Sequence, residues 1–231
     1  RHLLQLIWNQ RKQNAWLWAE LLLVSVFLWF LVDYLYVMGR TYTAPLGFDI
    51  RHTYSIVISS LSERSPDYIP KEKRERPDGV HLLTALDRIR TYPGVESACL
   101  TDGGMPYYMG SRNLVWRIDT LQVPCRYAFV TPEFFDVFRI YDKDGKTASL
   151  KRAIEDNNSI VISADVETMN PGLSLLGQKA YRGNVTDEIE ETIRGISVPI
   201  RRHEYTKAEP NVYRALRLSR MEEGYYEGMI D

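Results

Sequence analysis

The chain has 231 residues, with 29 Lys or Arg against 30 Asp or Glu, so its formal net charge is -1. A balance this close to zero excludes a general electrostatic affinity for nucleic acid. The hydrophobic fraction of 45% combines one long apolar segment with a region of ordinary globular composition. We find no internal repeat at the period of a solenoid or a propeller, which excludes those architectures, and no low-complexity segment.

Residues 15–38, AWLWAELLLVSVFLWFLVDYLYVM, form a nearly unbroken apolar segment near the start of the chain. At about 1.5 Å per residue, a helix of this length crosses a hydrocarbon layer of ~30 Å. The segment is longer than the apolar part of a cleavable signal peptide, and no Ala-x-Ala site follows it. We therefore predict a transmembrane helix that stays on the mature protein.

The residues flanking this segment predict its orientation. Basic residues are more frequent before it than after it: Arg1, Arg11 and Lys12 against Arg40 and Arg51. This excess favours a cytoplasmic N-terminus. Residues 1–14 mix apolar and polar side chains in a way that suits an amphipathic helix lying in the cytoplasmic interface.

Two acidic residues, Glu20 and Asp33, lie inside the apolar segment. A carboxylate in lipid costs at least a few kcal/mol, so such a residue is a functional candidate by default. Each lies within about one to one and a half turns of an end of the segment, where its side chain can reach the headgroups. That interpretation is favoured, and contact with a partner helix is the alternative.

Residues 39–231 are predicted to form an α+β domain with βαβ elements and two subdomains, one at about 50–130 with 178–202 and the other at 131–177. The run HTYSIVISSL at 52–61 has the composition of a strand. A helical apolar pattern then starts at Asp78 and ends before Pro93, and 95–100 reads as a second strand. Together these segments predict a βαβ unit.

Further along, residues 114–119 and 123–130 are predicted to form an antiparallel pair of strands. Thr131 and Pro132 indicate the start of a short helix, with Thr131 as the N-cap. Phe134 and Phe135 supply its apolar face and are interpreted as core residues. After these come a buried strand that enters a helix, with Ser163 or Asp165 as the cap, and two more strand-rich segments: 158–167, 175–183 and 191–202.

The two cysteines, Cys99 and Cys125, both lie in apolar, strand-like runs. If the domain faces an oxidising compartment a disulfide is possible, but buried free thiols are the favoured interpretation.

The sequence shows little sign of catalytic chemistry. The four histidines, at 2, 52, 81 and 203, have no zinc-ligand spacing, and no nucleophile elbow or P-loop occurs. The acidic residues between Asp187 and Glu191 could bind a cation, although a solvated acidic turn is the favoured interpretation. We therefore predict no catalytic residue, no metal site and no cofactor, and we do not expect an enzyme.

Several short motifs follow one another in a characteristic order. A Gly47-Phe48-Asp49 stretch follows the apolar segment, Pro93-Gly94-Val95 ends the first helix, VTPEFFDVFRI starts at residue 130, and Leu-Gly-Gln-Lys starts at 176. In this order the chain resembles the MacB/FtsX-like permeases of ABC transporters. Its Trp-rich apolar segment and Asp33-Tyr34 look like the variant found in Bacteroidetes-type bacteria.

This resemblance implies a permease subunit in the bacterial inner membrane with its main domain in the periplasm. It implies a separate cytoplasmic ATPase subunit, a second permease copy, and a possible periplasmic adaptor and outer-membrane component. It also implies structural roles for the residues at its motif positions: Gly47, Phe48, Pro93, Pro132, Phe134, Phe135 and Gly177. Permeases of this family have three more transmembrane helices, so the chain is expected to be a fragment.

Two other classes of function are compatible with the residues. One is a single-pass, membrane-anchored extracytoplasmic domain that binds a ligand and acts as a sensor. The other is an anchored periplasmic enzyme, for which a deep pocket with converging acid and base groups would be required.

Overall fold

The computed structural model describes residues 5, 8, 15–58, 61–70, 73–108, 110, 112–156, 158–182 and 189–219. These divide into two compact units, Arg1–Pro45 and Leu46–Asp231. The amphipathic helix expected at 1–14 lies almost wholly outside the described residues. The division of the second unit into two subdomains stays a prediction.

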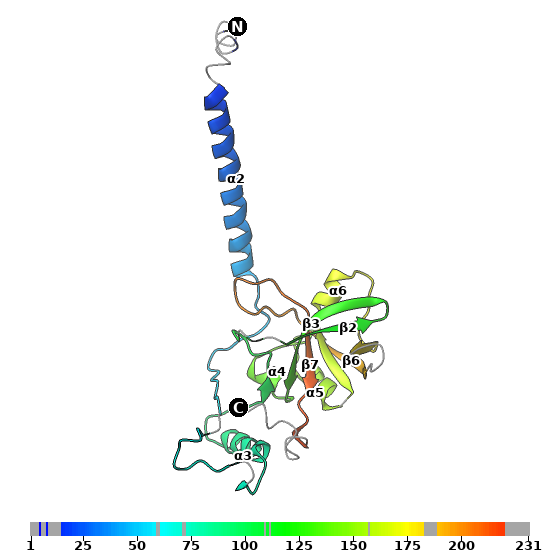
Figure 1. The fold of residues 1–231 in the computed structure, drawn as a ribbon. Coiled ribbons are helices and arrows are strands. Elements are labelled where there is room, and N and C mark those ends of the chain that lie inside the picture. The colour runs from blue at the N-terminus through cyan, green and yellow to red at the C-terminus, as the bar shows by residue number, and fades with distance from the viewer. Residues whose placement is uncertain are drawn as a thin grey trace. The chain divides into compact units, whose positions relative to one another are not determined.

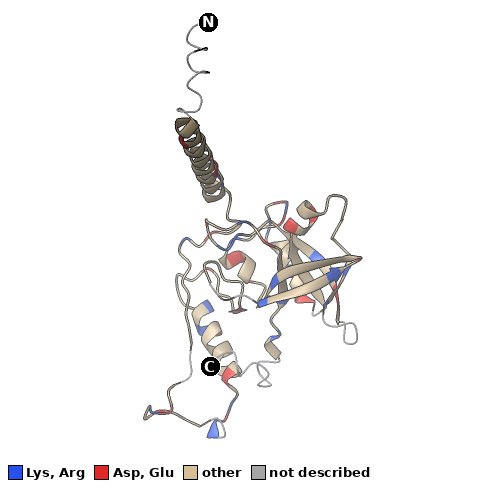
Figure 2. Ribbon diagram, turned by 45° about the horizontal axis from the view of Figure 1, so that its top comes forward, with Lys and Arg blue, Asp and Glu red and all other residues tan. Residues whose placement is uncertain are grey.

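The first unit consists of the helix α2, Ala15–Thr43, which confirms the predicted helix and extends it by five residues (Figure 1). Its most apolar 18-residue window has a mean hydropathy of 2.2, and no residue of the helix is buried within the chain. At about 1.5 Å per residue it is long enough to cross a bilayer. It is nearly free of charged side chains, whereas both signs are scattered over the second unit (Figure 2).

The second unit contains a closed, six-stranded barrel of mixed strand direction. The strands join in the order β3, β2, β5, β6, β4, β7, and β7 returns to pair with β3. The β6–β4 and β7–β3 pairs are parallel and the other four are antiparallel. The seventh strand, β1, extends one edge of β3. The bounds are β1 Thr101–Asp102, β2 Arg112–Ile118, β3 Leu121–Val130, β4 Ser159–Ser163, β5 Lys179–Arg182, β6 Ile189–Ser197 and β7 Asn211–Ala215.

Within the described residues, the helices of this unit with defined bounds are α3 Asp78–Arg90, α4 Phe134–Val137, α5 Ala148–Glu155 and α6 Asp165–Met169. Figure 1 shows the barrel strands curving round one another, with α4 and α5 outside them. The β2–β3 hairpin turns within two residues, and Asp119 takes a φ of 53°, in the left-handed region that such tight turns use.

The barrel wall separates two hydrophobic clusters, because successive residues of a strand point to opposite faces. Along β4, Ile160 and Ile162 belong to the cluster inside the barrel, while Val161 belongs to the outer cluster. Along β7, Val212 points inside and Tyr213 outside. All five residues of β4 are buried as a result.

Several expected elements are confirmed. The antiparallel pair β2–β3, the helix α3, the strand β4 followed by α6, and the strands β5 and β6 all form where the sequence indicates them. The fold class, a mixed α/β domain after one apolar helix, is the expected one.

The strands of the predicted βαβ unit do not form. In the described part of 52–61 and in 95–100 the backbone has no strand pairing, although α3 between them is helical. A parallel pair with a helix between its strands occurs instead at β4 and β6. Composition therefore predicted strands in the wrong two segments, because a strand forms only where another strand is available to pair with it.

Both predicted helix caps are wrong. The hydroxyl of Thr131 accepts a hydrogen bond from the Leu100 N–H at 3.2 Å, and Glu133 stands at the N-cap position of α4. The hydroxyl of Ser163 accepts from the Asn211 N–H at 2.9 Å, and Ala164 precedes α6. Each hydroxyl joins two segments of the sheet region instead of satisfying a helix terminus.

Candidate functional site

Residues 46–53 carry the chain from Pro45 into the folded unit and are fixed there by backbone hydrogen bonds. The Asp49 N–H donates to the Phe138 carbonyl at 2.9 Å, and the Arg201 N–H donates to the Leu46 carbonyl at 3.0 Å. Phe138 directly follows α4, and Arg201 lies beyond β6. The segment that follows α2 is thus held from two sides; we call residues 46–53 the junction segment.

Two side-chain contacts add to these bonds. Arg139 Nη1 donates to the carbonyl of Arg51 at 3.1 Å. The hydroxyl of Thr53 lies 3.4 Å from the carbonyl of Val137, at the long end of hydrogen bonding. The residues from Val137 to Arg139 therefore meet the junction segment along much of its length.

Gly47 is required by the geometry of the junction segment. Its φ is 83°, and a Cβ built there would lie 2.1 Å from the carbonyl oxygen of Pro199. Next to it, Phe48 packs on the outer cluster and meets the Tyr107 ring edge-on, with centroids 5.8 Å apart. The Gly-Phe pair of the sequence motif therefore allows a close approach and supplies an apolar contact.

The outer cluster to which Phe48 adds is rich in aromatic rings. Phe134 and Phe135 are fully buried, and their centroids lie 5.4 and 5.6 Å from that of Tyr213 on β7. This confirms their interpretation as core residues. Burial raises the pKa of the Tyr213 phenol, which stays neutral. The junction segment, α4 and the barrel wall are thereby packed into one continuous body.

Asp49 is the centre of a charged group on the junction segment. Its Oδ2 lies 2.6 Å from Arg51 Nη2 and 3.5 Å from Arg139 Nη1. The hydrogen bonds from the Arg51 side chain and backbone N–H, together with the charge of Arg139, lower the pKa of Asp49 to about 2. The carboxylate is ionised at neutral pH.

A hollow of about 450 Å³ opens beside this group. It is lined by Gly47, Phe48, Asp49, Arg51, His52, Arg139, Tyr141 and Val198. His52 and Arg139 have φ values of 62° and 49°, which non-glycine residues adopt rarely and at an energetic cost. The hollow was not foreseen from the sequence, because its lining comes from three distant parts of the chain.

A second charged group lies inside the barrel. Glu191 is 2% exposed, and its Oε1 accepts from Arg214 Nε at 2.7 Å and from Arg182 Nε at 3.3 Å. Its Oε2 lies 3.3 Å from Trp116 Nε1. Burial lowers the pKa of Arg214, while the Glu191 carboxylate acts against this shift. The three charges carry a net charge of +1 toward the end of the barrel opposite α6.

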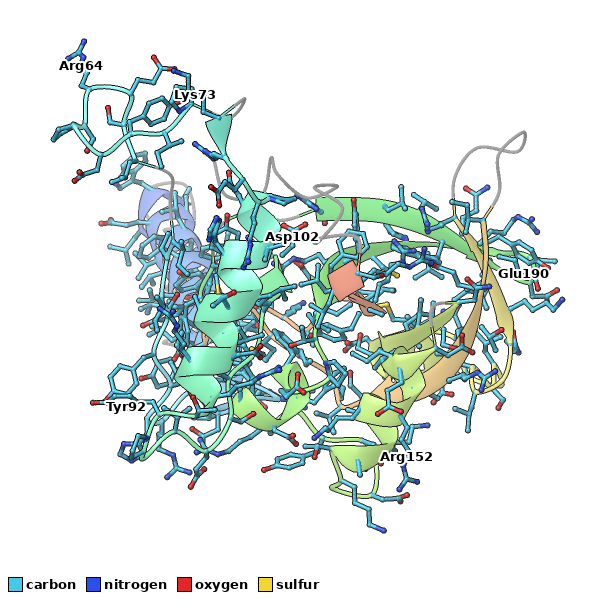
Figure 3. All side chains as sticks on the ribbon, turned by 90° about the horizontal axis from the view of Figure 1, so that it is seen from below. Arg64, Lys73, Tyr92, Asp102, Arg152 and Glu190 are labelled. Carbon is cyan, nitrogen blue, oxygen red and sulfur yellow. The ribbon has the colours of Figure 1, made fainter. Side chains whose placement is uncertain are left out.

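The expectation of a solvated acidic turn is therefore wrong for this part of the chain. Glu190 and Glu191 lie in the strand β6, not in a turn. Glu190 points away from the barrel, pairs with Lys179 at 2.8 Å and accepts from the Tyr181 hydroxyl (Figure 3). Asp187 and Glu188 lie outside the described residues. The two-residue spacing from Glu191 to the buried Ile193 was the signal that could have placed Glu191 inside.

The remaining candidate residues are not brought together. Glu20 and Asp33 are thirteen positions apart on α2, which places them about 140° apart around the helix axis. One partner helix therefore cannot contact both. Pro93 lies in the turn after α3, and Pro132 precedes α4. Gly177 has a φ of 84° with open space at its Cβ position, and its N–H donates to the Ile193 carbonyl.

The described residues contain no group of three His, Cys, Asp or Glu side chains that could hold a metal ion. Cys99 and Cys125 are both free thiols.

Comparisons with known proteins return structures only. No protein-family model matches the sequence, and no curated protein matches it. A domain of a protein described as a permease, from Porphyromonas gingivalis, is similar at 20% identity and TM-score 0.42, over 57% of this chain and 50% of that one. The periplasmic region of MacB from Actinobacillus actinomycetemcomitans is similar at 10% and 0.39, over 68% and 62%.

The extracellular domain of the noncanonic ABC-type transporter YknZ from Gram-positive bacteria is similar at 11% identity and TM-score 0.43, over 74% of this chain and 75% of that one. MacB is thus among the proteins to which the fold is similar. The chain spans half the length of the first of these structures and less than two thirds of the second.

Proposed function

We propose that the chain belongs to a permease subunit of a bacterial ABC transporter of the MacB/FtsX-like type. In this proposal α2 spans the inner membrane with its N-terminus in the cytoplasm, and the second unit lies in the periplasm. Motion driven by ATP hydrolysis in a separate subunit passes through α2 to that unit, which acts in the export or extraction of a substrate. The resemblance of the ordered sequence motifs supports this assignment.

The fixation of the junction segment is the observation that carries the proposal. A helix can move a domain only if the residues between them are held to that domain. Leu46 and Asp49 are bonded to two separate parts of the second unit, and Gly47 lies in close contact with Pro199. A displacement of Pro45 is therefore passed to α4 and to the barrel wall and is not absorbed by a loose linker.

The matched variants Gly47→Ala and Gly177→Ala test this coupling. The two glycines have nearly the same φ, 83° and 84°, so alanine adds similar backbone strain at each. Only at Gly47 does the new Cβ meet the Pro199 carbonyl. We expect Gly47→Ala to abolish the coupling and Gly177→Ala to retain it.

The measurement is the ATPase rate of the proposed partner ATPase, with and without the full-length permease subunit that contains this chain, in lipid nanodiscs. Wild type and Gly177→Ala should change the rate to the same extent, and Gly47→Ala should leave it at the basal value while its circular dichroism stays that of a folded domain. Normal coupling by a folded Gly47→Ala protein would contradict the proposal, as would the absence of any effect of wild type.

Asp33→Leu addresses the proposed contact with a second permease copy or with another helix of the complex. A carboxylate in the membrane is retained at a cost unless a partner uses it. We expect the variant to change the ATPase response while the melting temperature of the second unit is unaltered. An unchanged response would place Asp33 at the headgroups instead.

A ligand-binding sensor domain is the second candidate function, and the hollow at the junction segment is the observation that favours it. Its volume of about 450 Å³ lies in the range of small-molecule sites. A sensor would respond to its ligand in the absence of any ATPase, which separates the two functions.

A further inference from the structure

The hollow beside the junction segment carries more positive than negative charge. Arg51 and Arg139 both point their guanidinium groups toward the single carboxylate of Asp49. The three groups together have a net charge of +1, and His52 lies on the same wall. Asp49 therefore offsets the charge of one arginine and leaves the other unbalanced.

Part of each guanidinium group is available to a ligand. Arg51 uses Nε and Nη2 for Asp49, its side chain is 82% exposed, and its Nη1 has no partner among the described residues. Arg139 reaches Asp49 at only 3.5 Å, which is too long for a strong charged hydrogen bond. A ligand with several anionic oxygens can thus bind the two side chains at once.

The backbone at two residues that line the hollow is in an energetically unfavourable conformation. His52 and Arg139 both take positive φ values, although neither is glycine. Such strained residues collect at binding sites, because the surrounding structure holds them in place. Phe48 and Tyr141 provide an apolar wall on the same hollow.

The sequence places this site close to the end of α2. Arg51 is eight residues beyond Thr43, and an extended chain spans at most about 3.6 Å per residue. The hollow is therefore within roughly 30 Å of the end of the helix. If α2 lies in a membrane, as proposed above, this chain length allows the hollow to approach the headgroup layer, where basic groups are attracted to anionic lipids.

We propose that this hollow binds a phosphate group through Arg51 and Arg139, with the phosphodiester of an anionic phospholipid as its source. The guanidinium pair matches the oxygens of a phosphodiester, and the aromatic wall accommodates the glycerol part of the headgroup. A soluble phosphate compound offers the same oxygens, so the test below includes both sources. The lipid source depends on the membrane insertion of α2, but it does not depend on coupling to an ATPase.

The test is native mass spectrometry of the chain released from phosphatidylcholine nanodiscs that contain phosphatidylglycerol. Arg51→Gln with Arg139→Gln should weaken retention of phosphatidylglycerol about tenfold or more. The control is Arg88→Gln with Arg152→Gln, which removes the same charge from exposed side chains on α3 and α5; Arg152 points away from the barrel (Figure 3). This control should retain the lipid as wild type does.

Two further variants separate binding from folding. Arg51→Gln alone changes an exposed side chain and should still weaken retention severalfold. Asp49→Asn removes the carboxylate that competes for both arginines, so it should strengthen retention, whereas damage to the fold would weaken it. Glycerol 3-phosphate is titrated in parallel, and the shift in melting temperature is measured for each variant. If these shifts rank the variants in the same order as the lipid retention does, the soluble phosphate is the source.

Retention of phosphatidylglycerol, together with no shift by glycerol 3-phosphate, identifies the headgroup. Equal retention by wild type and the Arg51→Gln, Arg139→Gln protein, with no response to glycerol 3-phosphate, would overturn the site. So would weaker retention by Asp49→Asn. None of these results depends on ATPase coupling, so the permease proposal and the phosphate site fail separately.

Discussion

The same pentapeptide, SIVIS, occurs twice in the chain and has two different structures. At 159–163 it is the strand β4, in which Ile160, Val161 and Ile162 are fully buried. At 55–59 the described residues have no secondary structure, and Val57 is 86% exposed. The local sequence is identical, so the difference comes from the neighbours. The strand β4 lies between β6 and β7, and the described residues 55–58 of the earlier copy pair with no strand.

This comparison shows where the stability of the second unit comes from. The barrel closes because β3, β4, β6 and β7 find each other across long stretches of chain, and both faces of β4 are then covered. The junction segment is attached to that closed body. The described residues 54–58 and Leu61 are linked to it in sequence but are not part of its core.

The largest expected effect is the difference in stability loss between the buried and the exposed copy of SIVIS. Ile160→Ala should lower the free energy of unfolding by about 2–5 kcal/mol, because it leaves a cavity in a close-packed interior. Ile56→Ala is the same change at the same position of the other SIVIS copy, where the side chain is 63% exposed. It should change the free energy of unfolding by less than about 0.5 kcal/mol. Urea unfolding followed by circular dichroism measures both, and equal losses would contradict the two environments.

A smaller effect is expected from the buried charges of the barrel. Glu191→Gln should lower the free energy of unfolding by about 3 kcal/mol, because Arg182 and Arg214 are left with no opposite charge in a buried site. Glu190→Gln, at the neighbouring and exposed glutamate, is the control and should cost much less, because an exposed ion pair contributes little to stability. A similar small cost at both positions would show that the charges inside the barrel are solvated.

The smallest effect concerns the thiols and leaves stability unchanged. Burial raises the pKa of Cys99 and of Cys125 to about 12, so both are protonated at neutral pH. We expect native protein to react slowly with Ellman's reagent, and unfolded protein without reductant to release two thiols quickly. Release of no thiol on unfolding would indicate a disulfide and contradict the structure.

The sequence predicted the features that depend only on residues close together in the chain. The apolar run of α2, the three- and four-residue spacing of leucines in α3 and the alternation in β2 and β3 are all readable without tertiary structure. The Gly47-Phe48 motif indicated structural roles for both residues, although not the close approach of Gly47 to Pro199.

Features that depend on distant segments were not predictable from local patterns. The β3–β7 pairing closes the barrel between segments far apart in sequence, and the hollow takes Arg139 and Val198 from two other places. Glu191 looked like one of several surface acids because its partners, Arg182 and Arg214, are on other strands. In each case the local sequence does not indicate which distant segments come together in the folded structure.

Amide hydrogen exchange read out residue by residue tests most directly whether the junction segment belongs to the closed body. Val57 and Val161 serve as internal standards for the open and the buried copy of SIVIS. The account predicts that the Asp49 and Arg201 amides, which donate to Phe138 and Leu46, exchange at rates close to that of Val161. Exchange of the Asp49 amide as fast as that of Val57 would contradict it, because α2 would then be joined to the barrel by an unfixed linker.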